Sequence, residues 1–377
     1  MDQISQDWEV RTLDDLDPQG LQLVADFFNE QYPGVFYPKC TPQIFEWKLG
    51  PSNPAGTGFI TVAINGGKVI GVFTLTRKNM MRAGIRIKVG EIGDAYTHPK
   101  FRRGGRCVSP NAHLGESDEY YQKSIFGRLV AETLFRAKLN GVQFVYGTPN
   151  AVAKPSYIKR LGFLECDEGK IFSKYLLTNF FQNSNLLISA LRSLYKFNYF
   201  YSRLMLQFRM GVDSINRVTS EEVFNELVSN KAVNPKGINQ LEMFIDTGYI
   251  LHRYINHPTM EYSFYRVGTK EKVFGYVIAT EIVRASGIRT LVISDWVTFN
   301  TEFTKKFPLI LGCMRNFSRN AETISLWQSG RTPKYNLLLS GLFSGKRVSI
   351  VGKSLGDQTF TRELTFSDFR FGWSDNG

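Results

Sequence analysis

The chain has 377 residues, of which 43% are hydrophobic, so it is long enough to form two domains with cores of ordinary size. Its 46 basic and 34 acidic residues give a net charge of +12, which favours anionic partners without distinguishing nucleic acid, lipid, coenzyme A or a sugar nucleotide. No zinc-finger spacing, RNP-type aromatic strand or long Lys/Arg block occurs, so we expect no nucleic-acid partner.

The N-terminal residues 1–8 have neither the basic start nor the apolar core of a signal peptide. The four cysteines are scattered without Cys-x-x-Cys spacing or a nearby pair of histidines, which predicts neither disulfides nor a metal site. We therefore expect a cytoplasmic protein with no transmembrane span, no metal and no permanently bound cofactor.

In the first half, a helix pattern through Asn29 precedes a predicted hairpin over residues 59–76. A strand then ends in Gly93-Asp94-Ala95-Tyr96-Thr97-His98-Pro99, and a basic glycine turn at 101–105, a long helix and a strand over 142–148 follow. A strand that leads through a glycine turn into a helix points unpaired N–H groups and the positive end of the helix dipole at one place. This arrangement suits a diphosphate, and the strand edge beside it suits an amide-containing arm that carries a thioester.

Three features resemble the GNAT superfamily of acyl-CoA N-acyltransferases: Thr97 to Arg103, the helix start Ile125-Phe126-Gly127-Arg128-Leu129-Val130, and Asn150 followed by Tyr157 to Phe163. The resemblance implies acyl-CoA as a co-substrate. It also implies which residues bind the coenzyme: Tyr96, Thr97, Arg102, Arg103, Gly104, Gly105, Lys123, Ser124, Ile125, Phe126, Gly127 and Asn150.

The chain departs from the family pattern at two places. Residues 106–123 are an insertion before the helix, and Ser124 stands at its start as an N-cap. Ile158 occupies the position where many relatives have the tyrosine that protonates the leaving thiolate. Tyr157 is the neighbouring candidate, although a helix points adjacent side chains about 100° apart.

Transfer of an acyl group to an amine needs a proton acceptor and a donor to the oxyanion. Asp94 is the first candidate for the acceptor; alternatively it ties off a β-bulge. His98 has a suitable pKa but lies in a turn. We expect Glu91 to face the opposite way from Asp94. The backbone N–H of Tyr96 or Thr97 is the expected oxyanion donor, and Asn150 either contacts the pantetheine arm or caps a helix.

The second half repeats the order of predicted elements at an offset of roughly 200 residues, which indicates a duplicated domain. It has no arginine-glycine turn after Asp295, so we expect it to wall off an acceptor cleft. Asp295, Trp327 and three histidines (His113, His252 and His257) are candidates for that cleft, or ordinary core and surface residues. The prediction is an α+β protein with two GNAT-like domains in tandem, each a mixed, mostly antiparallel twisted sheet flanked by helices.

The predicted division is a catalytic domain at 1–168, a helical basic and aromatic connector at 169–212 and a degenerate domain at 213–377. Residues 169–211 include six Lys or Arg and no acidic residue. A segment of this kind could lie on a membrane surface, but we expect a helical pair packed between the two domains. Its aromatic side chains could also form an acceptor pocket.

The arrangement of motifs also resembles bacterial N-acyltransferases that act on nucleotide-linked amino sugars for surface polysaccharides. This resemblance implies a dTDP- or UDP-linked amino-deoxyhexose as the acceptor. One alternative is an aminoacyl-tRNA-dependent transferase of the peptidoglycan type, and another is a non-catalytic acyl-CoA sensor. The oligomeric state is left open, with a homodimer as one option.

Overall fold

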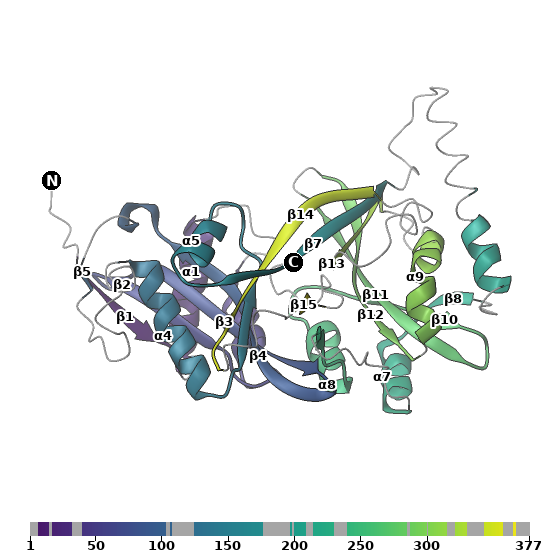
Figure 1. Cartoon of the computed structure of the whole chain (residues 1–377), viewed down its shortest axis with the longest axis horizontal. Coiled ribbons are helices and arrows are strands. Elements are labelled where there is room, and N and C mark those ends of the chain that lie inside the picture. The colour runs from purple at the N-terminus through teal and green to yellow at the C-terminus, as the bar shows by residue number, and fades with distance from the viewer. Residues whose placement is uncertain are drawn as a thin grey trace, which may run out of the picture.

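In a computed structural model, the chain forms two similar halves that share one continuous sheet (Figure 1). The structure describes residues 7–14, 17–31, 40–102, 106–107, 124–175, 197, 200–208, 214–229, 240–284, 287–299, 301–314, 321–329, 343–356 and 365–366. Arg103, Gly104, Gly105, His113 and Lys123 therefore lie outside the described residues, and their predicted roles stay predictions.

The first half contains the elements β1 (Asp7–Thr12), α1 (Pro18–Gln31), α2 (Pro42–Leu49), β2 (Phe59–Asn65), β3 (Lys68–Arg82), β4 (Ile85–Thr97), η1 (Pro99–Phe101), β5 (Arg106–Cys107), α4 (Ile125–Leu139), β6 (Phe144–Gly147), α5 (Lys154–Lys159) and β7 (Leu164–Tyr175). The hairpin turn between β2 and β3 uses Gly66 and Gly67, both with positive φ.

The second half contains β8 (Ser214–Val218), α7 (Ser220–Ser229), β9 (Gln240–Met243), α8 (Thr247–Ile250), the π-helical turn η2 (Leu251–Ile255), β10 (Ser263–Gly268), β11 (Val273–Val283), β12 (Arg289–Thr298), α9 (Thr301–Cys313), β13 (Thr323–Ser329), β14 (Phe343–Ser354) and β15 (Thr365–Phe366).

The two halves follow the same plan. In the first, β1 to β4 are paired antiparallel and β4 is parallel to β6; in the second, β8 and β10 to β12 are antiparallel and β12 is parallel to β13. One long helix follows β4 and another follows β12. The predicted α+β fold with two mixed, mostly antiparallel sheets flanked by helices is confirmed.

The halves exchange strands at their junction. β14, from the end of the chain, inserts between β6 and β7, while the far end of β7 pairs with β13 of the second half. Figure 1 shows β7 and β14 running side by side across the middle of the molecule. The predicted domain boundary at residue 168 therefore falls inside a strand that belongs to both sheets.

Four apolar clusters stabilise this arrangement. One lies between the first sheet and α4, and another between that sheet and helices α1 and α2. A third fills the second half against α9. The fourth joins the halves, because Val89 and Tyr146 of the first half pack there with Tyr249, Phe264 and other second-half residues. The junction is thus built like a domain core.

The connector differs from its prediction. Residues 169–175 belong to β7, so the helical prediction is wrong for them. Residues 200–208 are helical, but this helix does not pack between the halves, because its buried Leu206 lies in the core of the second half. Phe200 and Phe208 are 63% and 78% exposed on it.

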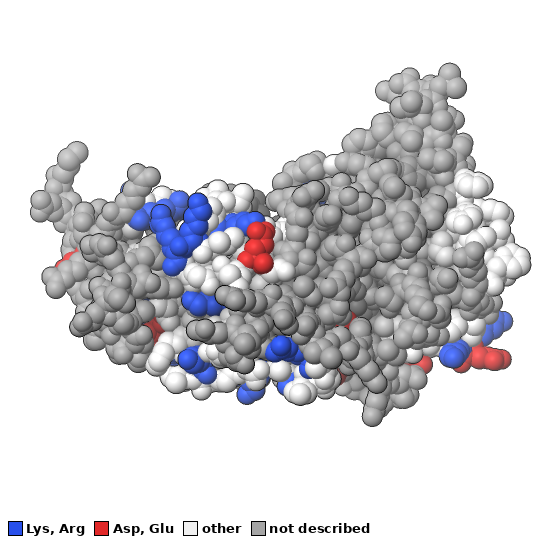
Figure 2. Space-filling view, in the orientation of Figure 1, with Lys and Arg blue, Asp and Glu red and all other residues white. Residues whose placement is uncertain are grey.

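Figure 2 shows where the described charged side chains lie on one face of the molecule. The described lysine and arginine side chains on this face lie mainly over the first half, where Figure 1 places α1, α4 and α5. Among the described residues, no helix is long and apolar enough to cross a membrane.

Candidate active site

Strands β4 and β6 separate partway along the first sheet. Their parallel pairing runs from Val89↔Phe144 to Ile92↔Gly147 and ends there. β4 continues to Thr97, still paired with β3 on its other side. The last five residues of β4 therefore face a gap beyond β6. An extended amide-containing chain can add to such a strand edge.

The N-terminus of α4 packs over β3 at the level of the end of β4. Gly71 on β3 is the register partner of Thr97, and a Cβ on Gly71 would lie 2.8 Å from Cγ2 of Ile125, the first residue of α4. Only glycine permits this close approach. The first turn of the helix is thereby held against β3, opposite Thr97 of β4.

The start of α4 offers backbone donors. The Ser124 hydroxyl accepts a hydrogen bond from the Gly127 amide at 3.2 Å, which confirms Ser124 as the N-cap. The amides of Ile125 and Phe126 lie in the first turn, where a helix provides no backbone acceptor. Together with the helix dipole, they form a site suited to a phosphate.

Two further groups lie at the same end of β4. Arg102 donates from Nε to the Thr97 carbonyl at 3.0 Å, and its guanidinium carbon lies 5.3 Å from the centre of the Tyr96 ring. The Thr97 hydroxyl oxygen is buried and has no hydrogen-bond partner among the described residues. A cation and an unsatisfied buried hydroxyl thus accompany the helix start, which fits an anionic ligand.

The direction of the backbone amides distinguishes between Tyr96 and Thr97, the two predicted oxyanion donors. The amide of His98 donates to Ile70 on β3 at 2.8 Å. Successive amides of a strand alternate in direction, so that of Tyr96 also turns towards β3, while that of Thr97 turns towards the gap. Of the two candidates, Thr97 has the suitable direction.

A β-bulge shapes β4 at Asp94. The register pairs are Phe73↔Ala95 and Leu75↔Ile92, so Gly93 and Asp94 together lie opposite Thr74. The extra residue changes the alternation of side chains. Asp94 and Glu91 therefore lie on the same face of the sheet, and the prediction that they face opposite ways is wrong.

Asp94 is held by a buried cation. Its Oδ2 accepts hydrogen bonds from Lys48 Nζ at 2.8 Å and from the Thr74 hydroxyl at 3.2 Å, while its own amide donates to the Thr74 hydroxyl at 2.8 Å. The side chains of Lys48 and Asp94 are 4% and 14% exposed. The second carboxylate oxygen, Oδ1, has no partner among the described residues and can accept a further hydrogen bond.

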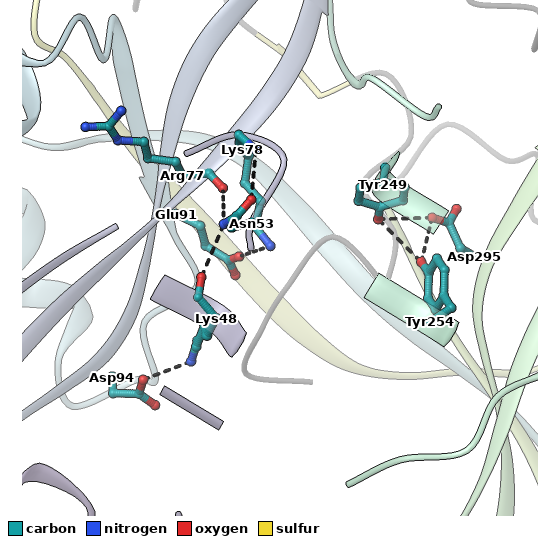
Figure 3. Close-up of polar contacts among 10 residues, drawn as sticks. Lys48, Asn53, Arg77, Lys78, Glu91, Asp94, Tyr249, Tyr254 and Asp295 are labelled. Carbon is teal, nitrogen blue, oxygen red and sulfur yellow. Dashed lines mark hydrogen bonds and ion pairs between the residues drawn. The ribbon is translucent and has the colours of Figure 1, made fainter. Parts of the chain in front are cut away.

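Sequence reasoning missed Lys48 as the partner of Asp94. Lys48 follows Phe45 by three positions on the buried side of α2, and a lysine on an apolar helix face was the one available signal. Figure 3 shows its ammonium group pointing to Asp94 and its carbonyl pointing to Asn53. The Asn53 side chain donates to the carbonyls of Lys48 and Arg77, at 3.2 and 3.1 Å, and so fixes the end of α2 against β3.

A second buried ion pair lies on the same face. Lys78 Nζ is 3.3 Å from Glu91 Oε2, and Glu91 is 1% exposed. The hydroxyl oxygen of Thr76, the register partner of Glu91, is buried without a hydrogen-bond partner among the described residues. The sheet face that carries Asp94 is thus lined by charged and polar groups both at Asp94 itself and at the neighbouring pair Thr76 and Glu91.

His98 and Asn150 both have local structural roles. His98 is the N-cap of η1, where its Nδ1 accepts from the Lys100 amide at 3.3 Å. Burial, with the charges of Lys100 and Arg102, lowers the pKa of His98, which favours the neutral imidazole that this bond requires. The Asn150 side-chain oxygen caps the turn after β6 by accepting from the amides of Val152 and Ala153. Asn150 therefore caps the turn that precedes α5, whose own N-cap is Ala153, and its predicted contact with the pantetheine arm stays a prediction.

Tyr157 lies in the apolar core of the first half. It is 4% exposed, and its ring packs edge-on against Phe126 and Phe163 at centroid distances of 5.4 and 5.2 Å. It therefore supports the first turn of α4, and its role as an acid stays a prediction.

Cys40 lies near Asp94 but is not activated. Burial raises the pKa of the Cys40 thiol to about 11; the Asp94 carboxylate raises it further and Lys48 lowers it. The thiol is therefore protonated at neutral pH, and a protonated thiol is a poor nucleophile.

β12 of the second half has a corresponding bulge at Asp295, but the side chains around Asp295 differ from those around Asp94. Asp295 is completely buried, and its Oδ2 accepts hydrogen bonds from the Tyr254 hydroxyl at 2.8 Å and the Tyr249 hydroxyl at 3.3 Å (Figure 3). Burial raises the pKa of Tyr254 well above its usual value, and the Asp295 charge raises it further. Trp327 is also buried, at 5% exposure. The suggestion that Asp295 and Trp327 face a cleft is wrong.

No protein-family model and no curated protein sequence matches the chain. Solved structures do match it. A GCN5-related N-acetyltransferase from Anabaena variabilis is 14% identical, with a TM-score of 0.55 over 92% of this chain and 73% of that one. A tandem GNAT protein from the clavulanic acid biosynthesis pathway is 11% identical, with a TM-score of 0.53 over 93% of this chain and 99% of that one. The chain has the tandem GNAT fold.

A third match has a bound acyl donor. Saccharomyces cerevisiae N-myristoyltransferase, in a structure with bound myristoyl-CoA, is 11% identical with a TM-score of 0.53, over 92% of this chain and 82% of that one. The tandem GNAT fold thus accounts for the repeated order of elements in the two halves.

Proposed function

We propose that this tandem GNAT chain is an acyl-CoA-dependent N-acyltransferase whose reaction takes place in its first half. The observation that carries the proposal is the end of β4 beyond its pairing with β6, near which the start of α4 and Asp94 lie. The pantetheine arm of acyl-CoA pairs with the end of β4, and its diphosphate lies at the amides of Ile125 and Phe126 and at Arg102.

The reaction proceeds by direct attack. The neutral amine of the acceptor adds to the thioester carbonyl and forms the C–N bond, while the Thr97 amide donates to the oxyanion. Asp94 Oδ1 accepts the proton that the nitrogen loses. The tetrahedral intermediate then breaks its C–S bond, and the coenzyme leaves as a thiolate that is protonated by water. Cys40 forms no acyl intermediate, because its thiol stays protonated at neutral pH.

We further propose that the acceptor is an amino-deoxy sugar linked to a nucleotide. The acylated sugar would be made in the cytoplasm and used to build a surface polysaccharide. The motifs of the first half support this proposal, since they resemble those of such enzymes. The net charge of +12 also suits an acceptor and a donor that both carry a diphosphate.

One observation favours a second candidate, an acyl-CoA sensor that does not transfer the acyl group. Ile158 stands where a proton-donating tyrosine is expected, and Tyr157 packs in the core. A sensor requires the same donor site but no acceptor.

Release of free thiol from acetyl-CoA and longer acyl-CoA thioesters, assayed with a panel of UDP- and dTDP-linked amino sugars, separates the two functions. We expect acceptor-dependent thiol release and an acylated sugar in the mass spectrum. Binding of acyl-CoA without thiol release across the panel would instead support the sensor. Absence of acyl-CoA binding would refute both.

A further inference from the structure

An open groove lies between the two halves, on the side of α2 that faces the π-helical turn η2. Its volume is about 460 Å³, which lies in the range of small-molecule sites. The polar and aromatic side chains that line it are Gln43, Glu46, Trp47, Ser52, His252 and Asn256. Both halves of the chain therefore form its walls.

Trp47 fixes the two walls relative to each other. Its indole N–H donates to the His252 carbonyl at 2.8 Å, and its ring stacks on His252 with centroids 5.1 Å apart. The Arg253 guanidinium carbon lies 5.3 Å from the Trp47 ring centre, and the His257 ring centroid lies 4.3 Å away. These contacts preorganise the groove before any ligand enters.

The groove adjoins a second cavity that reaches α2 and β3. A smaller cavity of about 30 Å³ shares Trp47, Pro54 and His252 with it and continues to Lys48. The ammonium group of Lys48 in turn contacts Asp94. Lys48 therefore links the adjoining cavity, though not the groove itself, to the proposed proton acceptor.

The chemistry of the lining restricts the ligand. Gln43 and Asn256 each offer amide donors and an acceptor, Ser52 offers a hydroxyl, and Glu46 offers two acceptor oxygens. None of the described residues that line the groove is Lys or Arg. Such a surface matches a ring with several hydroxyl groups. A diphosphate there would meet the Glu46 carboxylate, with no Lys or Arg among the described lining residues to neutralise it.

We propose that this groove seats the sugar ring of the acceptor, with its nucleotide diphosphate outside, and that Glu46 and Asn256 select the ring through its hydroxyl groups. The proposal rests on the proposed N-acyltransferase function. It assigns the degenerate second half a direct part in substrate recognition through Asn256.

The test measures kcat/KM with acetyl-CoA and three amines: glucosamine, UDP-glucosamine and ethanolamine. Variants E46Q and N256A each weaken hydrogen bonds to the ring, so we expect kcat/KM to fall about tenfold for glucosamine and by the same factor for UDP-glucosamine. Ethanolamine has no ring, and its kcat/KM should not change. Matched controls are E281Q and Q143A, which alter exposed side chains that do not line the groove.

Each other outcome has a definite meaning. Wild-type rates with both amino sugars in E46Q and N256A would overturn the groove as the ring site while leaving the N-acyltransferase intact. A fall confined to UDP-glucosamine would place the nucleotide in the groove and overturn the assignment. Turnover of ethanolamine but of neither amino sugar would refute the sugar class. No turnover of any amine, despite acyl-CoA binding, would refute the proposed function itself and this inference with it.

Discussion

The contact between Lys48 and Asp94 allows the structural and chemical roles of Asp94 to be separated. In D94N, the amide oxygen can still accept a hydrogen bond, but the Lys48 ammonium, 4% exposed, loses the carboxylate 2.8 Å away. Removing one partner of a buried ion pair is destabilising, and we expect the free energy of unfolding to fall by about 3 kcal/mol. The variant K48M should cost a similar amount, since it leaves the carboxylate with Thr74 alone.

The double variant K48M/D94N carries neither charge. Because an apolar side chain of similar length replaces the lysine, we expect most of the lost stability to return, with a coupling of about 2 kcal/mol between the two positions. Turnover should not return. If Asp94 accepts the proton from the amine, kcat stays about 100-fold below wild type in both D94N and the double variant.

Urea unfolding followed by tryptophan fluorescence gives the stabilities, and thiol release from acetyl-CoA with a nucleotide-linked amino sugar gives kcat. Recovery of both stability and kcat in the double variant would refute the chemical role, because Asp94 would then act only through the fold. Additive losses of stability would show that the ion pair contributes nothing beyond its separate side chains.

Three further predictions follow from described contacts. R102E should weaken acetyl-CoA binding at least tenfold, measured by calorimetry, because it places a negative charge at the expected diphosphate position. The control variant R203E changes a remote arginine and should bind acetyl-CoA as the wild type does. Equal affinities of R102E and the wild type would remove Arg102 from the donor site. Y254F should lower the free energy of unfolding by about 2 kcal/mol, since Asp295 loses the shorter of its two tyrosine hydrogen bonds. The affinity for acetyl-CoA should not change. A melting temperature equal to that of the wild type would contradict this prediction. The pKa of His98 is lowered in the folded protein, so the unfolded chain binds more protons at this residue. The free energy of unfolding should therefore fall as the pH drops below 6.5, and it should fall less steeply in H98Q. Parallel plots of stability against pH for the two proteins would exclude His98 as the cause.

The fold could be predicted largely because its signals are local. The turn at Gly66 and Gly67, the Ser124 cap and the sequence from Asn150 to Phe163 each specify a short segment, and their order repeats in the second half. Strand exchange leaves no such signal, since the pairing of β14 with β6 joins residues about 200 positions apart. The connector was misassigned for the same reason, because residues 169–175 are a strand only by virtue of distant partners.

The site was predicted less completely than the fold. Asp94 and Thr97 could be proposed as site residues from the sequence because they lie in the motif itself. The bulge that turns Asp94 to the side of Glu91 depends on the register with β3, which the alternation of side chains alone does not reveal. The groove beside Trp47 is formed by residues 205 positions apart, so its existence follows only from the packing of the two halves.

The strand exchange also has a consequence for how the protein is made. Until β14 leaves the ribosome, β6 and the near end of β7 lack the neighbour that lies between them in the finished sheet. Two neighbouring strand edges without their partner can form hydrogen bonds with other nascent chains and so promote aggregation. Translation through the C-terminal segment is thus the step that completes the N-terminal lobe, and messages truncated before codon 343 should yield insoluble product rather than an active fragment.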